Sequence, residues 1–364
     1  MRYKRFSILI LFFALAFAQP TATYYQSQTV RLLALKPGAS GQEHAIRDDH
    51  GLPFSVISLK GNDGLPYWYR RIFTPVCLTG ECRPVDIGIY WHFSGKYLGI
   101  EIYREPLTKT DHSEFSPLDY DRLEHILRNE WSELREYTAE ELVEPVDTVD
   151  TPGTVDAVTG ATRKAISEAA VKDAVYTTHT IWHLIHVGEP EQLSLLALSE
   201  MSNHPEVAHR LLASGDIENR NFILRGIADG HLLADSVCEQ AVLHGLNAND
   251  PTWRDLAFKA LSQLNLSARD LQDRIPDIYL QMKAGEKVRL LMALESTDRV
   301  HPSLRRTLLN EFTEDAQPWI RIKILSLLQK VHASLTPEER VLIRNLDTDH
   351  IPLRKALDDF LRGQ

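Results

Sequence analysis

Between residues 52 and 103 the chain follows a strand-like pattern of apolar and polar positions. Residues 54–59 form a short β-rich run, and residues 86–93 and 97–103 form two longer ones. Only Ser-Gly-Lys at positions 94–96 separates the two longer runs, and two such runs around a short glycine-containing turn are typical of a β-hairpin. The sequence therefore predicts a small β-rich region here.

Helical spacing begins after this region. Ser116 is a candidate N-cap followed by a proline, and apolar residues then recur every three or four positions, at Leu123, Ile126, Leu127 and Trp131. A second, longer helical stretch is predicted from residue 163 to about 186. Gly-Glu-Pro at 188–190 ends it, and we expect a domain boundary there.

Beyond residue 190 the pattern is helical throughout, with an internal repeat. Three segments align with one another, and their last leucines are 33 residues apart each time (294 − 261 and 327 − 294): residues 254–261, 287–294 and 320–327. Residues 221–227 and 352–357 are looser outer copies. Helical units that bury one apolar face only against their neighbours are typical of an α-solenoid. The pattern resembles HEAT-type repeats, with a plain helical bundle as the alternative.

The first residues have the anatomy of a secretory signal peptide. A basic start is followed by the almost wholly apolar residues 6–17 and by Ala-Phe-Ala at 16–18, a typical cleavage pattern. The apolar run is short for a membrane span, which needs about 20 residues, although a short anchor is the alternative. Gln19 rather than cysteine follows, so a lipoprotein anchor is not indicated. We expect cleavage after residue 18, no direct membrane insertion of the mature chain, and a periplasmic or extracellular location.

Charge excludes one class of partner. The 364-residue chain has a formal net charge of −10. Nucleic-acid binding requires clustered lysines and arginines, and no such run follows the first few residues. We therefore expect no nucleic-acid partner.

The three cysteines suit an oxidising compartment. Cys77 and Cys82 enclose Leu-Thr-Gly-Glu, and a structural disulfide between them is the preferred interpretation. A redox-active dithiol is the alternative, although the spacing is not C-x-x-C. Arg83 follows Cys82, so the C-x-x-C-H pattern of haem attachment is not met. Cys238 lies in an apolar helical pattern and is predicted to be a buried, unpaired thiol.

The segment Thr-Gly-Ala-Thr at 159–162 is the strongest candidate for chemistry. It is predicted to lie where an extended segment enters a helix, and its small residues permit a close approach of a ligand to the backbone. Free N–H groups at the start of a helix favour a phosphate. By themselves these features indicate an anion site or an ordinary N-cap.

Residues 156–162 resemble the attachment motif of FMN-binding domains in exported flavoproteins and in subunits of ion-pumping reductases. That pattern is Asp, two variable residues, Ser or Thr, Gly, Ala, Thr, and here Asp156, Thr159, Gly160, Ala161 and Thr162 fill every fixed position. The resemblance covers roughly residues 80–186. It implies that a FAD:protein FMN transferase esterifies Thr162 with the phosphate of FMN, while the other four residues serve recognition and backbone approach.

One loop departs from the family pattern. Members often carry Glu-Thr-Pro-Gly after the hairpin strand, in a loop over the flavin, whereas residues 104–112 of this chain differ. Lys109 is the candidate flavin contact in this loop, with a solvated surface lysine as the alternative. His112 is a weaker candidate.

The predicted helix after the motif carries three histidines on one face. His179, His183 and His186 fall at i, i+4 and i+7, which is a spacing seen in metal sites. No carboxylate joins them at helical spacing, and histidines beside Trp182 more often pack or cap. We predict no metal, and core packing for Tyr176 and Trp182.

These features together predict an α+β FMN-binding domain followed by an all-α, HEAT-like solenoid. The predicted divisions are a signal peptide (1–18), an N-terminal extension (19–51), the FMN-binding domain (52–188) and the helical-repeat domain (189–364). The resemblance implies an extracytoplasmic electron carrier with covalent FMN, serving membrane or periplasmic electron-transfer proteins, rather than a stand-alone enzyme with catalytic residues. The alternatives are a flavin-free adaptor that binds a protein through its repeats and a thiol–disulfide carrier built on Cys77 and Cys82.

Overall fold

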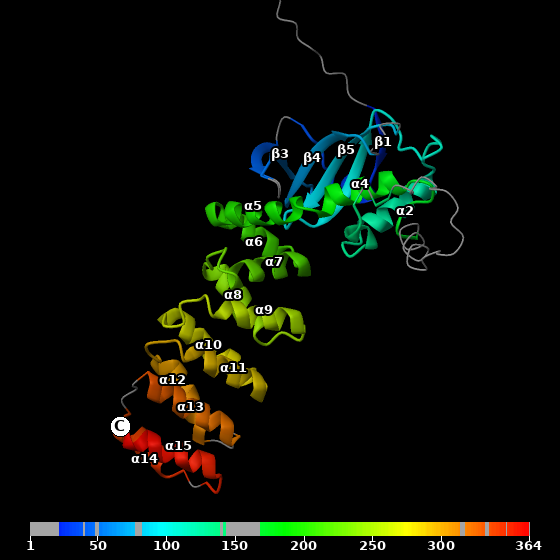
Figure 1. The fold of residues 1–364 in the computed structure, drawn as a ribbon. Helices are drawn as coiled ribbons and strands as arrows, with labels where there is room; N and C mark the ends of the chain where they lie inside the picture. Colours follow the sequence, from blue (N-terminus) through cyan, green and yellow to red (C-terminus); the bar gives the residue numbers. More distant parts are fainter. Residues whose placement is uncertain are drawn as a thin grey trace, which may run out of the picture. The chain divides into compact units, whose positions relative to one another are not determined.

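The computed structural model divides the chain into two compact units, the sheet unit and the helical unit (Figure 1). The sheet unit comprises residues 1–62, 67–92 and 96–189, and the helical unit comprises residues 63–66, 93–95 and 190–364. The residues that the structure describes are 22–38, 41–47, 51–76, 82–138, 141–142, 168–313, 317–331, 335–346 and 348–363.

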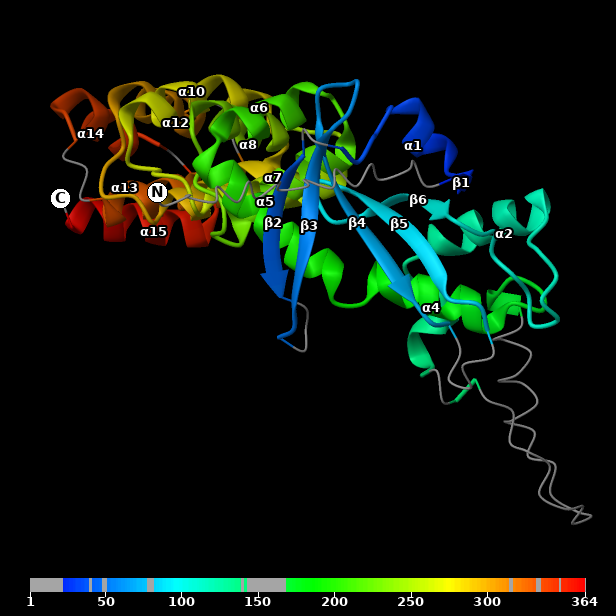
Figure 2. The same cartoon turned by 90° about the horizontal axis from the view of Figure 1, so that it is seen from above.

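A six-stranded sheet forms the centre of the sheet unit, in the order β1-β6-β5-β4-β3-β2 (Figure 2). Its strands are β1 (Thr23–Gln26), β2 (Gln42–Arg47), β3 (Pro53–Lys60), β4 (Pro66–Thr74), β5 (Val85–His92) and β6 (Tyr97–Tyr103). The pairs β5–β6, β4–β5, β2–β3 and β1–β6 are antiparallel. The predicted strand at 54–59 and the predicted hairpin at 86–103 are confirmed as β3, β5 and β6.

The segment set apart above as an N-terminal extension belongs to the sheet. β1 pairs with β6 and β2 pairs with β3, so both edges of the sheet come from residues before Leu52. Between these strands lies the short helix α1 (Gln28–Leu32), whose Val30 is completely buried. Edge strands carry many polar residues because one side is solvated, so they lack the apolar pattern by which the inner strands are recognised.

The two faces of the sheet have different chemistry. Ile87, Ile89 and Trp91 of β5 are fully buried on one face, which the helices α2 (Pro117–Leu127) and α4 (Val175–His186) cover in Figures 1 and 2. The indole N–H of Trp91 donates to the carbonyl oxygen of Ile185 in α4 at 3.2 Å, which fixes α4 against the sheet.

The opposite face is built around a buried carboxylate. Glu101 accepts hydrogen bonds from the hydroxyls of Tyr90 (2.7 Å), Tyr103 (2.7 Å) and Thr23 (2.9 Å), and Tyr69 bonds to Tyr103 at 3.2 Å. A buried charge is tolerated when its lone pairs are satisfied in this way. The network therefore ties the edge strand β1 to the three central strands.

Gly88 leaves the space that this network needs. A Cβ at this position would lie 2.7 Å from a ring carbon of Tyr69 and 3.0 Å from the hydroxyl of Tyr103. We expect Gly88→Ala to lower the free energy of unfolding by about 1–3 kcal/mol, because both tyrosines are held in place by hydrogen bonds. Urea denaturation tests this, with Gly285→Ala as the control. Nothing lies within 4 Å of a Cβ on Gly285, so an equal loss there would contradict the packing explanation.

Both helices predicted for the sheet unit differ in length from the expectation. Ser116 caps α2 as predicted, in a capping box with Asp119, but α2 ends at Leu127 and Trp131 is 77% exposed. The predicted continuous helix over 163–186 is interrupted within its described part: residues 170–174 are not helical, and α4 begins at Val175. Asp173 adopts a left-handed conformation with φ of 59°, which a helix cannot contain.

The helical unit consists of consecutive helices, of which the first, α5, starts at the boundary residue Glu189. They are α5 (Glu189–Asn203), α6 (Pro205–Ala213), α7 (Ile217–Ala228), α8 (Ser236–Gly245), α9 (Pro251–Leu261), α10 (Arg269–Gln281), α11 (Ala284–Leu294), α12 (Pro302–Thr313), α13 (Pro318–Lys330), α14 (Pro337–Arg344) and α15 (Ile351–Arg362). No strand lies among its described residues beyond 190. The predicted α+β region followed by an all-helical region is thereby confirmed.

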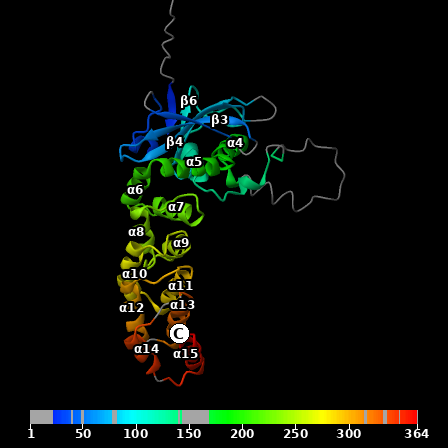
Figure 3. The same cartoon turned by 90° about the vertical axis from the view of Figure 1, so that its left-hand side faces the viewer.

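The 33-residue period corresponds to alternate helices. The aligned leucines Leu261, Leu294 and Leu327 are completely buried on α9, α11 and α13. Contacts run from α7 through α9, α11 and α13 to α15, and a second series runs from α6 through α8, α10 and α12 to α14. Figure 3 shows these two series lying side by side along the unit.

Candidate functional site

The predicted attachment motif lies outside the described residues. Asp156, Thr159, Gly160, Ala161 and Thr162 all fall within 143–167, so the structure describes only what precedes and follows them. The site is therefore built from its flanks, which come from α2, α4 and the loop after β6.

Hydrogen bonds hold both flanks of the motif against the two helices of the sheet unit. Before it, the hydroxyl of Tyr176 in α4 donates to the carbonyl oxygen of Leu142 at 3.1 Å. After it, the guanidinium of Arg122 in α2 donates to the carbonyl oxygen of Glu168 at 2.5 Å. The described residues on either side of the motif are thus held at defined places, Leu142 on α4 and Glu168 on α2.

The loop of residues 104–115 packs on the turn that follows the motif. Within the loop, Lys109 donates its N–H to the carbonyl oxygen of Ser113 at 2.8 Å. Thr110 donates both its backbone N–H (2.8 Å) and its hydroxyl (2.9 Å) to the carbonyl oxygen of Asp173. The loop predicted to face the ligand therefore lies beside the chain eleven residues after Thr162 (173 − 162).

Lys109 forms an ion pair with Asp119 in the first turn of α2. Its ammonium lies 3.0 Å from a carboxylate oxygen of Asp119, and both side chains are at most one-fifth exposed. Burial alone would raise the pKa of Asp119, but hydrogen bonds from Ser116 and the charge of Lys109 hold it below the usual value. The ion pair fastens the loop to the N-terminus of α2, and a flavin contact of Lys109 stays a prediction. His112 is exposed, with a left-handed φ of 66°.

The three histidines of α4 bond to backbone rather than to one another. The Nε2 atoms of His179, His183 and His186 lie 2.7, 2.8 and 2.8 Å from the carbonyl oxygens of Tyr137, Leu134 and Leu127. A carbonyl only accepts, so each Nε2 carries the proton. These bonds attach α4 to the end of α2 and to the short 3₁₀ helix η1 (Glu133–Glu136). Among the described residues, no cluster of His, Cys, Asp or Glu is placed to hold a metal ion.

This arrangement predicts a loss of stability in mild acid. Burial lowers the pKa of His186 below its ordinary value of about 6.5, so the folded chain binds its proton less readily than the unfolded chain does. Above about pH 6.5 the imidazole is neutral in both states and costs no stability. As the pH falls below that value the unfolded chain takes up the proton first, so the free energy of unfolding decreases. Urea unfolding between pH 7 and 5 should show this slope, and His186→Gln should reduce it. The same change at the exposed His231 should leave the slope intact; an equal effect there would contradict the assignment.

The described contacts of the cysteines add no support for the alternative function of a thiol–disulfide carrier. Cys77 lies outside the described residues, so its pairing with Cys82 stays a prediction. Cys238 is buried and free, as predicted. Burial and the neighbouring Asp235 raise the pKa of its thiol to about 12, which keeps it protonated and unreactive at neutral pH.

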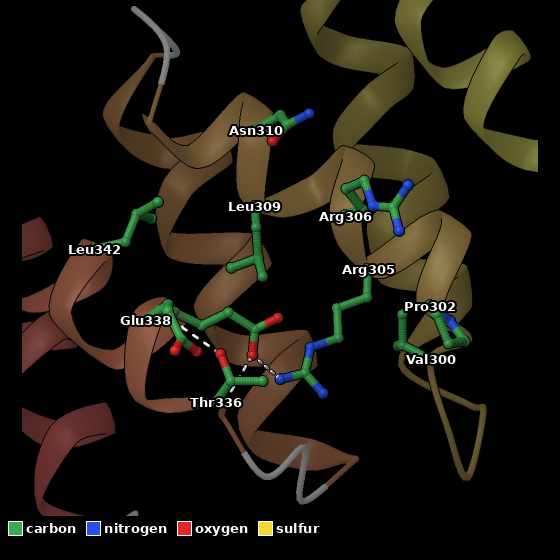
Figure 4. Close-up of a pocket in the computed structure, with 10 residues that line it drawn as sticks. Val300, Pro302, Arg305, Arg306, Leu309, Asn310, Thr336, Glu338 and Leu342 are labelled. Carbon is green, nitrogen blue, oxygen red and sulfur yellow. Dashed lines mark hydrogen bonds and ion pairs between the residues drawn. The ribbon is translucent and has the colours of Figure 1, made fainter.

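The helical unit contains a cavity of about 470 Å³ between α12 and α14 (Figure 4). Apolar side chains of Leu309 and Leu342 line it together with the ion pair between Arg305 and Glu339. Glu339 also completes the capping box of α14 with Thr336. Two of the charged groups on its walls are therefore engaged with each other and with the start of α14.

The chain matches no protein-family model, no curated protein and no solved structure. The attachment motif and the described contacts around it are therefore the features that bear on function. Two residues in those contacts, Thr110 and Asp173, were not predicted from the sequence, because nothing in either segment signals a partner 63 residues away.

Proposed function

We propose that this chain is an extracytoplasmic electron-transfer flavoprotein that carries FMN on Thr162 through a phosphoester. The observation that carries the proposal is the complete motif Asp156-Ala-Val-Thr-Gly-Ala-Thr162. The signal-like first 18 residues agree with it, because a covalent tether retains a cofactor that would otherwise be lost outside the cytoplasm. The transferase that attaches FMN is then a required partner.

The contacts of the two flanks support the proposal. Leu142 and Glu168, the described residues on either side of 143–167, are both bound through their backbone carbonyls to helices of the sheet unit. When bound, FMN supplies the redox chemistry, accepting and releasing electrons. The chain's own residues hold the cofactor and set its surroundings, with the loop of residues 104–115 as the adjoining described surface.

We further propose that the helical unit is a HEAT-like α-solenoid that docks the carrier on a membrane or periplasmic electron-transfer protein. Its alternate helices contact one another in two series, and ion pairs join successive repeats: Arg220–Asp250 (3.3 Å), Arg254–Glu286 (3.5 Å) and Lys287–Glu311 (2.8 Å). Such arrays present extended surfaces for protein partners. Within the described residues, no helix is both long and apolar enough to cross a membrane.

The proposal is tested by producing the chain with and without a FAD:protein FMN transferase in the periplasm. We expect one FMN phosphoester in the intact mass and flavin absorbance that survives denaturation, both dependent on the transferase. A chain that stays unmodified beside a transferase active on a known substrate overturns the proposal. It would favour the adaptor, or the thiol–disulfide carrier if Cys77 and Cys82 exchange with a dithiol probe.

A further inference from the structure

The cavity between α12 and α14 lies where two helices of the even-numbered series meet. In the preceding pair of helices, Asp273, the fifth residue of α10, accepts a hydrogen bond from the hydroxyl of Ser303, the second residue of α12. The corresponding residues of the next pair are Arg306, the fifth of α12, and Glu338, the second of α14. The structure describes both, and no ion pair or hydrogen bond joins them although their charges are opposite. A contact that joins α10 to α12 is therefore missing between α12 and α14.

The space that stays open is apolar in its centre. Leu309 of α12 and Leu342 of α14 line it, and these two leucines are one period of 33 residues apart (342 − 309). Leu309 is 6% exposed, whereas Leu342 is 40% exposed. The cavity volume of about 470 Å³ lies within the range of small-molecule pockets, which is about 300–1,000 Å³. The cavity can therefore hold a small ligand with an apolar group.

Hydrogen-bond donors lie on one side of this apolar centre. Figure 4 shows Arg306 and Glu338 on opposite sides of Leu309. Asn310, about one turn after Arg306 on α12, also lines the cavity. Within the described part of the chain, the side chains of Arg306 and Asn310 have no hydrogen bond or ion pair. Their N–H groups are available to a ligand carboxylate, which a guanidinium binds through two parallel hydrogen bonds.

The carboxylate of Glu338 is the complementary acceptor. Its own backbone N–H and the hydroxyl of Thr336 hold the pKa of Glu338 below the usual value, so the group is charged at neutral pH. The other two charges on the walls, those of Arg305 and Glu339, are paired with each other. A ligand with two negative charges would be repelled by the neighbouring carboxylates, whereas a zwitterion is attracted by both Arg306 and Glu338.

We propose that this cavity is a binding site for a small zwitterion with an apolar side chain, namely an amino acid or a short peptide. Arg306 and Asn310 bind the ligand carboxylate, and Glu338 binds its ammonium group. The apolar side chain packs between Leu309 and Leu342. All five residues belong to the helical unit, so the inference stands independently of flavin attachment.

Saturation-transfer NMR titrations of the full chain with L-leucine and with leucyl-leucine test the inference. We expect saturable binding with dissociation constants on the order of 1 mM, because ligands of this size bury little surface. N-acetyl-leucine lacks the ammonium charge and leucinamide lacks the carboxylate, so each should bind about fivefold more weakly than leucine. Tighter binding of leucyl-leucine than of leucine assigns the site to a peptide, and the reverse order assigns it to a free amino acid.

Two variants separate the two charges of the site. In Glu338→Gln the preference for leucine over N-acetyl-leucine should disappear, while the preference over leucinamide persists. In Arg306→Gln the opposite result is expected. Both residues are exposed, so the melting temperature should stay at the wild-type value. Arg344→Gln, which removes an exposed arginine of α14 outside the cavity, is the matched control and should keep both preferences.

A third variant tests the apolar contact. Leu342→Ala should weaken the binding of leucine and leave the weaker binding of glycine unchanged. The absence of saturable binding of both leucine and leucyl-leucine to the wild type overturns the inference. Equal affinities of the wild type for leucine, N-acetyl-leucine and leucinamide also overturn it, because the two charges then take no part. Preferences that persist in both Arg306→Gln and Glu338→Gln would place the ligand elsewhere and have the same consequence.

Discussion

Thr162→Val should abolish covalent flavin completely, from about one FMN per chain to none. The proposed bond is a phosphoester through the Thr162 hydroxyl, and valine has the same shape without an oxygen. The fold should be unaffected, because the described flanks are held through Tyr176 and Arg122. Intact mass and absorbance after denaturation measure the result directly.

Two further variants sharpen this experiment. Thr154→Val changes a threonine in the same stretch but outside the motif, and it should be modified like the wild type. Asp156→Ala should be modified more slowly without unfolding, because Asp156 is proposed to act in recognition by the transferase. Flavin that resists denaturation in Thr162→Val would show that another residue is the acceptor, and the assignment of the motif would be wrong.

The inner strands and the repeat were predictable because local pattern and tertiary packing agree there. The runs at 86–93 and 97–103 are apolar because both strands are central in the sheet, and the leucines at the 33-residue period are all buried. β1 and β2 escaped prediction because edge strands such as Gln42–Arg47 carry polar residues on their solvated sides. Trp131 continued the spacing of α2 but is exposed, since the helix ends at Leu127.

The candidate site shows the same division between local and long-range information. Helical spacing runs without a glycine or proline through residues 163–186, so nothing local predicts the break at 170–174. That break is stabilised by Thr110, which is distant in sequence. The three histidines of α4 have metal-like spacing, yet their partners are carbonyl oxygens, which no side-chain pattern reveals. The motif itself was identified through its resemblance to a family, and its chemistry stays a prediction.

The other large effect is expected from removing the helical unit. A chain that ends at Glu189 retains the whole sheet, α2, α4 and the ion pair of 2.6 Å between Arg70 and Glu189. It should fold, accept FMN and be reduced by dithionite. If the repeats dock the carrier on its electron donor, reduction by that donor should slow by about 100-fold, because the tethered encounter becomes a bimolecular one.

A second truncated chain, ending at Asn203, shows whether a failure of the shorter chain comes from the loss of α5. The tips of two hairpins, residues 63–66 and 93–95, group with the helical unit, and a Cβ on Gly95 would collide with the carbonyl of Pro190. A chain ending at Asn203 keeps α5 and with it Pro190, the neighbour of Gly95. It should therefore melt at a higher temperature than the chain ending at Glu189. If only the chain ending at Asn203 accepts FMN, α5 completes the flavin domain and the boundary lies after it. If neither does, the helices are required for the sheet unit to fold, and the docking role would lose its basis.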